Sequence, residues 1–264
     1  MSGVLERTLG ILETLATAPQ GLPLATIADR LDMPRSGCHR LLADLVRLGW
    51  VRQTRDHGDY ALTLRMTALG LGHLAAAGVV DIAQPLLDRL AEATGELVRL
   101  SVWQEEVLTW VAKAQGARSG LRYDPDQGQV ARLSCSAAGQ AILSTMSDEQ
   151  ALMQVARQGF GRPEDFGPNA PTTAKALSAA LVETRARGYS VTIETFTAGM
   201  TAIAAPIVAP DGALLGAISV AGPCVRFGAD RIAAIGAELV AAAAELGIAG
   251  AASPLFRSRA PTLA

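Results

Sequence analysis

Apolar residues recur at helical spacing through the first part of the chain and predict three helices. The first helix covers residues 3–18, and the Pro19-Gln20-Gly21 segment ends its pattern. The second is short and lies within residues 24–31. The third begins at Pro34, because the missing N–H of proline costs nothing at the first helical position. The predicted buried stripes are Val4, Leu5, Leu9, Ile11, Leu12 and Leu15 in the first helix, and Leu41, Leu42, Leu45 and Leu48 in the third.

A strand-turn-strand pattern follows the third helix. Gly49 ends that helix, and Trp50 and Val51 begin a strand. Residues 56–59 (DHGD) then supply turn chemistry before a second strand in residues 60–64. A short helix, a tight turn, a second helix and a hairpin, in this order, predict a winged helix-turn-helix over residues 1–65.

An apolar helix leads from this domain to a region of mixed helices and strands. Residues 66–78 are predicted to form a linker helix, and it is apolar enough that a second copy is expected to cover it. Residues 79–249 are predicted to form an α+β domain with about five strands, since the last strands follow one another through tight turns. Residues 250–264 are expected to be a disordered tail. The expected strands lie in 97–103, 106–114, 130–134, 189–196, 201–209 and 213–222, and the expected helices in 81–95, 136–146, 147–159, 173–188 and 229–248.

Composition narrows the class of protein. The chain has 264 residues, of which 50% are hydrophobic, and this is enough to bury two cores. No apolar run free of charges reaches the length of a membrane span, and the N-terminus carries charges where a signal peptide would be apolar. A cytoplasmic protein without a membrane partner is therefore expected. Cys38, Cys135 and Cys224 are far apart and form no CxxC pair, so neither a disulfide framework nor a metal site is predicted, and no cofactor is expected.

Positive charge gathers around the predicted third helix and hairpin. Residues 33–55 contain five arginines and one acidic residue, a balance of +4, whereas the whole chain carries −2. A local basic face on an acidic protein suits contact with phosphate. Such arginines also occur on helix faces that are merely solvated. The order of the elements around them favours double-stranded DNA as the partner.

Five segments together resemble a known family. They are VLERTLGILETL, PRSGCHRLLADLVRLGWV, SCSAAGQAILS, RARGYSVTIETFTAGMTAIAAPI, and DGALLGAISVAGP followed by Arg226. In this order and spacing the chain resembles the IclR-type bacterial transcriptional regulators over essentially its whole length. The resemblance implies a winged helix-turn-helix, a linker helix and a GAF-like domain that binds a small effector and sets DNA affinity. It also implies homodimers, often paired into homotetramers, on palindromic operators. We therefore expect a repressor of a catabolic operon and not an enzyme.

The family's DNA contacts map by position onto the predicted third helix and wing. Ser36 and the helix N-terminus would hold phosphate, and Arg40 is the best candidate for a bidentate contact with guanine. The alternative for Arg40 is an ion pair with Asp44, one helical turn along. Gly37 stands where the family often has threonine, which removes one hydroxyl contact. The full set of implied DNA-binding residues is Arg35, Ser36, Gly37, His39 and Arg40 on the helix, and Arg52, Arg55 and His57 in the wing.

The family's effector pocket maps to the place where the SCSAAGQ turn meets the last strands. Small residues there allow close approach, and the N–H groups that open the helix can receive a carboxylate, which fits an organic acid. Family members that bind small keto acids have an acid, a cysteine and a second serine where this chain has Thr192, Ala202 and Ala221. This departure indicates a ligand with a larger apolar body, such as an aromatic or alkyl acid. The implied lining residues are Ala137, Ala138, Gly139, Thr192, Ala202, Ser219 and Ala221.

Other interpretations of the C-terminal region stay open. Trp103, Trp110, Tyr123, Phe196 and Met200 could form pocket walls, but aromatic residues on strands are more often plain core. Cys135 and Ser136 could be taken for nucleophiles. All three histidines precede residue 74, however, so none is available in this region to activate them, and a Ser-Lys pair could draw only on Lys113 or Lys175. Redox sensing through Cys135, near a helix N-terminus, is the remaining alternative, whereas the apolar setting of Cys224 disfavours it there.

Overall fold

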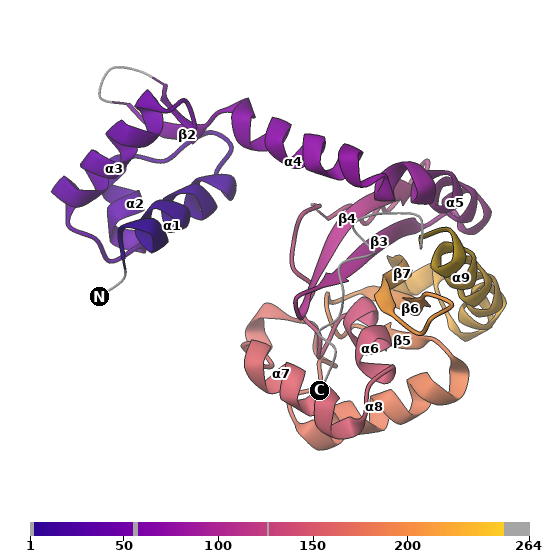
Figure 1. Cartoon of the computed structure of the whole chain (residues 1–264). Helices are drawn as coiled ribbons and strands as arrows, with labels where there is room; N and C mark the ends of the chain where they lie inside the picture. Colours follow the sequence, from indigo (N-terminus) through magenta and orange to yellow (C-terminus); the bar gives the residue numbers. More distant parts are fainter. Residues whose placement is uncertain (1–2, 55–57, 126, 251–264) are drawn as a thin grey trace. The chain divides into compact units, whose positions relative to one another are not determined.

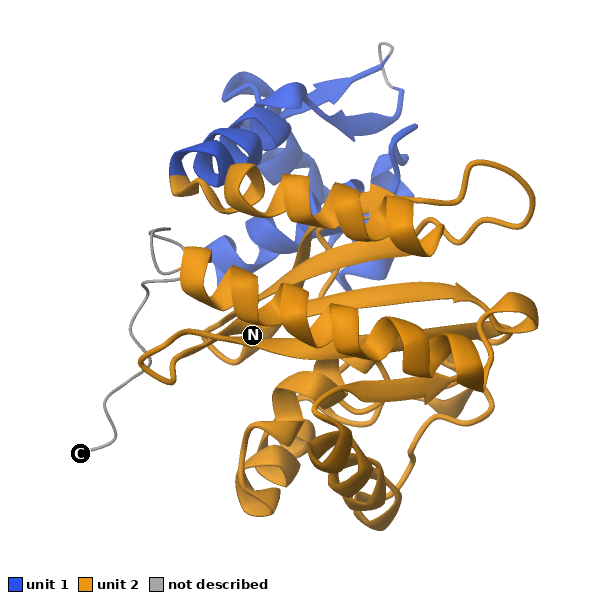
Figure 2. Ribbon diagram, turned by 90° about the vertical axis from the view of Figure 1, so that its right-hand side faces the viewer, with its two compact units in different colours: residues 1–76 blue, residues 77–264 orange. Residues whose placement is uncertain are grey.

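The computed structural model describes residues 3–54, 58–125 and 127–250, and these form two compact units. The first unit comprises residues 1–76 and the second residues 77–264 (Figure 2). Arg55 and His57 of the predicted wing, and nearly all of the expected disordered tail, lie outside the described residues. The first unit contains α1 (Val4–Ala16), α2 (Leu24–Arg30), α3 (Arg35–Arg47), β1 (Val51–Gln53) and β2 (Tyr60–Leu62), followed by α4 (Leu64–Ala77) (Figure 1).

The core of the first unit differs from the predicted buried stripes in both α1 and α3. Ile11 and Leu15 of α1 are buried, whereas Val4, Leu5 and Leu9 are exposed, because only the C-terminal half of α1 packs on the other helices. In α3 the leucines at 41, 42 and 45 are buried together with Cys38. Leu48 is 47% exposed, since α3 ends at Arg47 and the chain turns toward β1. Pro34 is the N-cap residue of α3 rather than its first residue.

The predicted hairpin is present and is tied to the rest of the first unit. β1 and β2 pair antiparallel, with Val51 opposite Leu62. Leu22 forms a β-bridge with Tyr60, so the α1–α2 loop supports the inner strand of the hairpin. At the base of the hairpin, Arg65 donates to the carbonyl oxygen of Leu48 and lies 4.8 Å from the centre of the Trp50 ring. The start of α4 is thereby fixed to the end of α3 and the beginning of β1.

The second unit is a five-stranded antiparallel sheet with helices on both faces. The strands are ordered β4-β3-β7-β6-β5. The predicted strand at residues 130–134 is absent from this order, because that segment makes only one isolated bridge, between Val130 and Thr109. The elements are α5 (Val79–Thr94), β3 (Leu97–Gln104), β4 (Val107–Gln115), α6 (Ala137–Ser144), α7 (Asp148–Gln158), α8 (Ala174–Arg187), β5 (Ser190–Ile193), β6 (Met200–Val208), β7 (Leu214–Pro223) and α9 (Ala229–Gly250), with short 3₁₀ turns at Pro163–Asp165 and Cys224–Arg226.

Each face of the sheet has its own hydrophobic core. Helices α5 and α9 cover one face, and α6, α7 and α8 lie on the other (Figure 1). By length and composition α9 could cross a membrane, and among the described helices no other single one could. Its buried residues, including Leu239 and Leu246, belong to the core against the sheet, which is the arrangement of a core helix.

A bulge in β4 decides which side chains reach which core. Leu100 of β3 pairs with Ala112 and Ser101 pairs with Trp110, so Val111 has no partner in the ladder. The extra residue reverses the alternation of faces along β4. Trp110 therefore packs with the α6 side of the sheet, whereas Ala112 packs with α5 and α9.

Candidate functional site

The outer face of α3 carries the predicted contact residues of the first unit. Arg35, Ser36, His39 and Arg40 are exposed, and Gly37 is half-buried with open space around its α-carbon. The helix has no side-chain cap, and its first backbone hydrogen bond runs from the Cys38 N–H to the Pro34 carbonyl oxygen. Within the described residues the N–H groups of positions 35–37 therefore donate no hydrogen bond. Such free N–H groups at a helix N-terminus attract phosphate.

The arginines of α3 differ in their availability. Asp44 pairs with Arg47, at 3.1 Å between Oδ1 and Nη2, and not with Arg40. Arg40 makes no ion pair within the described residues, so the expected competition with Asp44 is not found. On the hairpin, Arg52 is exposed while its neighbour Val51 is buried, which is the alternation of a strand. Arg40 and Arg52 are thus both free to meet an external anion.

The second unit contains a cavity between the sheet and the start of α6. Six of the seven pocket residues that the resemblance implies line it, and Gly139 does not. Thr192, Ala202 and Ala221 come from three adjacent strands, because Thr192 pairs with Ala202 and Ala202 pairs with Ala221 across the sheet. The complete lining is Arg99, Trp110, Tyr123, Ser136, Ala137, Ala138, Thr192, Phe196, Thr197, Met200, Ala202, Ser219 and Ala221.

The N-terminus of α6 presents two free donors to this cavity. Ser136 is the N-cap, and its Oγ accepts the N–H of Gly139 at 3.0 Å. The N–H group of Gly139 is therefore used in the helix cap. A side chain at Gly139 would also meet the backbone of Leu133 at 2.5 Å, so its small size serves helix packing. The N–H groups of Ala137 and Ala138 donate no hydrogen bond within the described residues, and both alanines line the cavity.

Arg99 is a buried cation that the sequence analysis missed. Its side chain is only 5% exposed, and its Nε and Nη1 atoms have no hydrogen-bond partner. The guanidinium carbon lies 4.0 Å from the centre of the Trp110 ring and 5.9 Å from that of Tyr123. Burial lowers the pKa of the Arg99 guanidinium to about 10, which still leaves it charged at neutral pH. The indole Nε1 of Trp110 is likewise buried without a partner.

The alternation of β3 places Arg99 on the cavity side. Val98, Leu100 and Val102 point to the core under α5 and α9, so Arg99 and Ser101 point to the opposite face. Arg99 pairs across the sheet with Ser219, which lines the same cavity. A charged residue inside an otherwise apolar strand was the available sequence signal.

Aromatic side chains form the remaining walls. Phe196 meets Trp110 edge to face, with 5.7 Å between ring centres. Tyr123 comes from the loop after β4, and its hydroxyl lies 3.3 Å from Thr197 Oγ1. Trp103, a wall candidate on β3, does not line the cavity.

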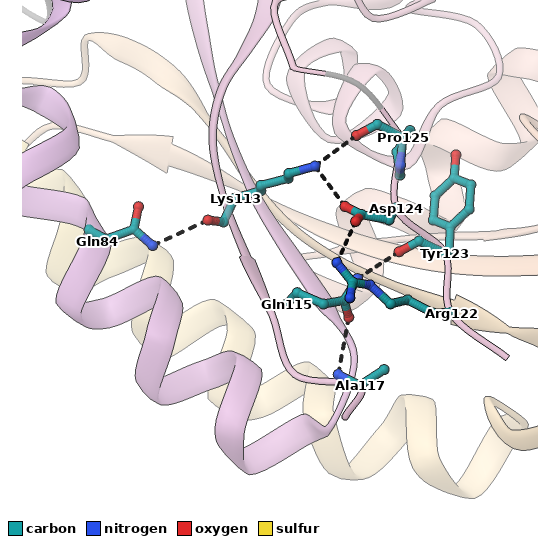
Figure 3. Close-up of polar contacts among 8 residues, drawn as sticks. All are labelled: Gln84, Lys113, Gln115, Ala117, Arg122, Tyr123, Asp124 and Pro125. Atoms are coloured by element: carbon teal, nitrogen blue, oxygen red, sulfur yellow. Dashed lines mark hydrogen bonds and ion pairs between the residues drawn. The ribbon is translucent and has the colours of Figure 1, made fainter. Parts of the chain in front are cut away.

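Hydrogen bonds hold the loop that carries Tyr123 against β4 (Figure 3). Lys113 Nζ donates to Asp124 Oδ1 at 2.6 Å, and Gln115 Nε2 donates to the Tyr123 carbonyl oxygen at 2.9 Å. Arg122 also pairs with Asp124. Hydrogen bonds from Lys113 and Arg122 lower the pKa of the Asp124 carboxyl, so their contribution to holding the loop is present above that pKa and is lost as pH falls through it.

The cavity is nearly filled by its own side chains. Its free volume of about 20 Å³ is room for about one water molecule. A wider groove of about 750 Å³ lies beside α5, but it is open and lined by exposed charged residues such as Glu92 and Arg118, which pair with each other. The smaller cavity is the better candidate site, because its donors are buried and unpaired.

Cys135 does not have the environment of a reactive thiol. It is buried, and desolvation raises its pKa to about 12. Ser136 is engaged in the helix cap and donates to the carbonyl oxygen of Arg132 at 2.6 Å. Neither side chain is poised for nucleophilic attack in this structure.

Comparison with known proteins gives a family match for each of the two units. Residues 4–55 match the IclR helix-turn-helix domain, and residues 72–248 match the C-terminal domain of bacterial transcriptional regulators of the IclR type. The acetate operon repressor of Salmonella typhimurium is 30% identical, and the alignment covers 93% of this chain and 89% of that protein. The transcriptional regulator BhcR of Paracoccus denitrificans is 34% identical, over 92% and 85% of the two chains.

Solved structures show the same fold. An IclR transcriptional regulator from Alicyclobacillus acidocaldarius has a TM-score of 0.79 at 22% identity, covering 94% of this chain and 98% of its own. An IclR homolog from Microbacterium hydrocarbonoxydans, complexed with 4-hydroxybenzoate, has a TM-score of 0.75 at 22% identity, covering 95% and 100%. The family matches, the relatives and the fold agree, and the chain belongs to the IclR family of bacterial transcriptional regulators.

Proposed function

We propose that this protein is a cytoplasmic, ligand-responsive repressor of a catabolic operon. Residues 1–65 bind a palindromic operator, residues 66–78 link the units, and residues 79–249 bind a small, partly apolar organic acid. Two copies, or a dimer of dimers, occupy the two half-sites of the operator.

The observation that carries this proposal is the convergence at one cavity of buried donors and apolar walls. In the described part of the chain, the N–H groups of Ala137 and Ala138 and the Nε and Nη1 atoms of Arg99 have no hydrogen-bond acceptor, and no acidic side chain is among the lining residues. An acceptor-rich, anionic ligand complements such a site. The aromatic walls suit an apolar body, and a family member of the same fold is complexed with an aromatic acid.

The DNA side of the proposal rests on the free outer face of α3. Arg35 and Arg40 are exposed on this face, and Arg52 is exposed on the neighbouring hairpin. The experiment is to incubate the purified protein with fragmented genomic DNA of its own organism, capture the protein and sequence the bound fragments. Enrichment of a short palindrome upstream of a catabolic operon supports the proposal. A variant with Arg35 and Arg40 both changed to alanine is the control, and equal enrichment by that variant would contradict it.

Capture is repeated with small organic acids added, because a repressor that responds to an acid changes its operator occupancy when the acid binds. Loss of the enriched fragment with one acid and not with its neutral amide supports the sensing role. If no acid that binds the protein changes operator binding, the sensing role is wrong while the DNA-binding role stands.

A further inference from the structure

We infer that Arg99 is the anchor of the effector cavity, and that it pairs with the carboxylate of an aromatic monocarboxylic acid whose ring packs on Trp110. This inference rests on the proposed function, because it names the ligand class of the same cavity. It also assigns the selectivity for such acids to two side chains, Arg99 on strand β3 and Trp110 on strand β4.

The guanidinium of Arg99 is buried without a hydrogen-bond acceptor for two of its nitrogens. A guanidinium has five N–H donors, and burying it without an acceptor costs free energy. Within the described residues, Nε and Nη1 of Arg99 and Nε1 of Trp110 have no hydrogen-bond partner, and the lining contains no acidic side chain to supply one. Buried N–H groups without an acceptor are explained if a ligand brings the missing acceptor.

The lining residues indicate the charge and the shape of that ligand. A carboxylate offers two oxygens in the geometry of the guanidinium fork. Among the described residues that line the cavity, Arg99 is the sole lysine or arginine, so one negative charge is matched and a second would stay unpaired. Trp110, Phe196 and Tyr123 present flat apolar surfaces, which favour a planar ring over a short aliphatic chain.

The Arg99 guanidinium occupies the face of Trp110 in this structure. It stacks on Trp110 at 4.0 Å, and the free volume of about 20 Å³ cannot hold a benzene ring. The ligand's ring therefore takes the place on Trp110 as the guanidinium turns toward the carboxylate. Because the cation and the ring exchange places on one indole, binding should change the fluorescence of Trp110.

The test uses calorimetry on the full chain with benzoate, 4-hydroxybenzoate and phenylacetate, each compared with its primary amide. Arg99→Met removes the charge but keeps an unbranched side chain, and Arg99→Lys keeps the charge without the fork. Arg118→Met is the matched control, because the Arg118 side chain is 85% exposed and does not line the cavity. Tryptophan fluorescence is recorded in the same titrations.

We expect the unmodified protein and Arg118→Met to bind at least one acid more than 50-fold tighter than its amide. Arg99→Met should lose at least 30-fold in affinity for the acid and less than 3-fold for the amide, and Arg99→Lys should fall between. Since Arg99→Met removes an unpaired buried charge, its melting temperature without ligand should not fall. If it does fall, the comparison of acid and amide on Arg99→Lys decides the question.

Three results would overturn the inference. They are binding of none of the three acids by the unmodified protein, equal affinity for acid and amide, or an unchanged acid affinity in Arg99→Met. None of these results bears on operator capture, so the DNA-binding part of the proposed function survives them. Failure of operator capture, in contrast, would reject the proposed function even if benzoate binds through Arg99.

Discussion

At the scale of single residues, the surroundings of a side chain decide what it can do more than its type does. Arg40 and Arg47 are both on α3 and both exposed, yet Arg47 is paired with Asp44 and Arg40 is free within the described residues. An exposed pair of this kind contributes little to stability, about 0.3–0.5 kcal/mol on a helix. Its larger effect is that Arg47 is engaged. Beyond the first turn of α3, Arg40 is then the arginine that is available to contact a base.

We predict that Arg40→Ala weakens operator binding by roughly 1–3 kcal/mol and relaxes base choice at one position of each half-site, because a bidentate guanine contact is lost. Arg47→Ala is the control, and its operator affinity should change by less than half of that. The measurement is a titration of operator fragments carrying each base at that position. Unchanged affinity in a folded Arg40→Ala protein would remove Arg40 from the base-reading set.

Cys135 gives a prediction about pH. With a pKa of about 12, its thiol stays protonated through pH 9, so iodoacetamide should modify it very slowly in the folded protein. In the unfolded chain the thiol ionises near pH 8.5–9, so the unfolded state loses protons first. This contribution therefore lowers stability as pH rises above about 9 and has no effect below it.

The measurement is mass spectrometry of alkylated peptides at pH 7 and pH 9, with urea-unfolded protein as the reference. Cys38 is also buried with a raised pKa and should behave like Cys135, whereas Cys224 is half-buried. Rapid modification of Cys135 in the folded protein would support the alternative function, redox sensing through Cys135.

At the scale of elements, the sequence predicted the helices and the hairpin well, because capping residues and periodic apolar positions are local. Ser147, for example, caps α7 together with Gln150. The sequence could not show the unpaired Val111 in β4, since a bulge depends on the register with β3. That register brings Trp110 to the side of the sheet where Arg99 lies. The sequence could therefore name Trp110 as a possible pocket wall, but it could not place Trp110 beside Arg99. Residues 130–134 were mistaken for a strand because their apolar run serves packing without a ladder.

The start of α6 gives the prediction at this scale. Ala138→Leu should abolish the effector response while leaving operator binding by the unliganded protein, because the added atoms fill the cavity beside the free N–H groups. Overpacking of this kind costs typically 1–3 kcal/mol, so the variant should melt lower but stay folded. Ala179→Leu, at an exposed position of α8, is the control. Operator release assays with the bound acid provide the measurement, and a normal response in Ala138→Leu would remove α6 from the site.

At the scale of the whole molecule, the net charge is small, but positive charge is concentrated in one stretch of the chain. Residues 1–76 hold eight arginines and seven acidic residues, so the first unit is almost neutral. Its positive face arises because residues 33–55 carry five of the arginines and, besides Asp44, no acid. The second unit has more acids than bases. Attraction to DNA must therefore come from this one face, and the rest of the surface opposes non-specific binding.

This separation predicts the salt dependence of operator binding. If Arg35 and Arg52 neutralise about two phosphates, the logarithm of the binding constant should fall against the logarithm of salt concentration with a slope of about −2 for one copy and about −4 for two copies on a palindrome. Operator affinity measured from 50 to 300 mM potassium chloride gives the slope, and half-site fragments separate one copy from two. A change of Arg52 to alanine should reduce the slope by about 1 per copy without altering base choice. A slope near zero would mean that these arginines are solvated surface, and equal slopes on half-site and full palindrome would mean that one copy suffices.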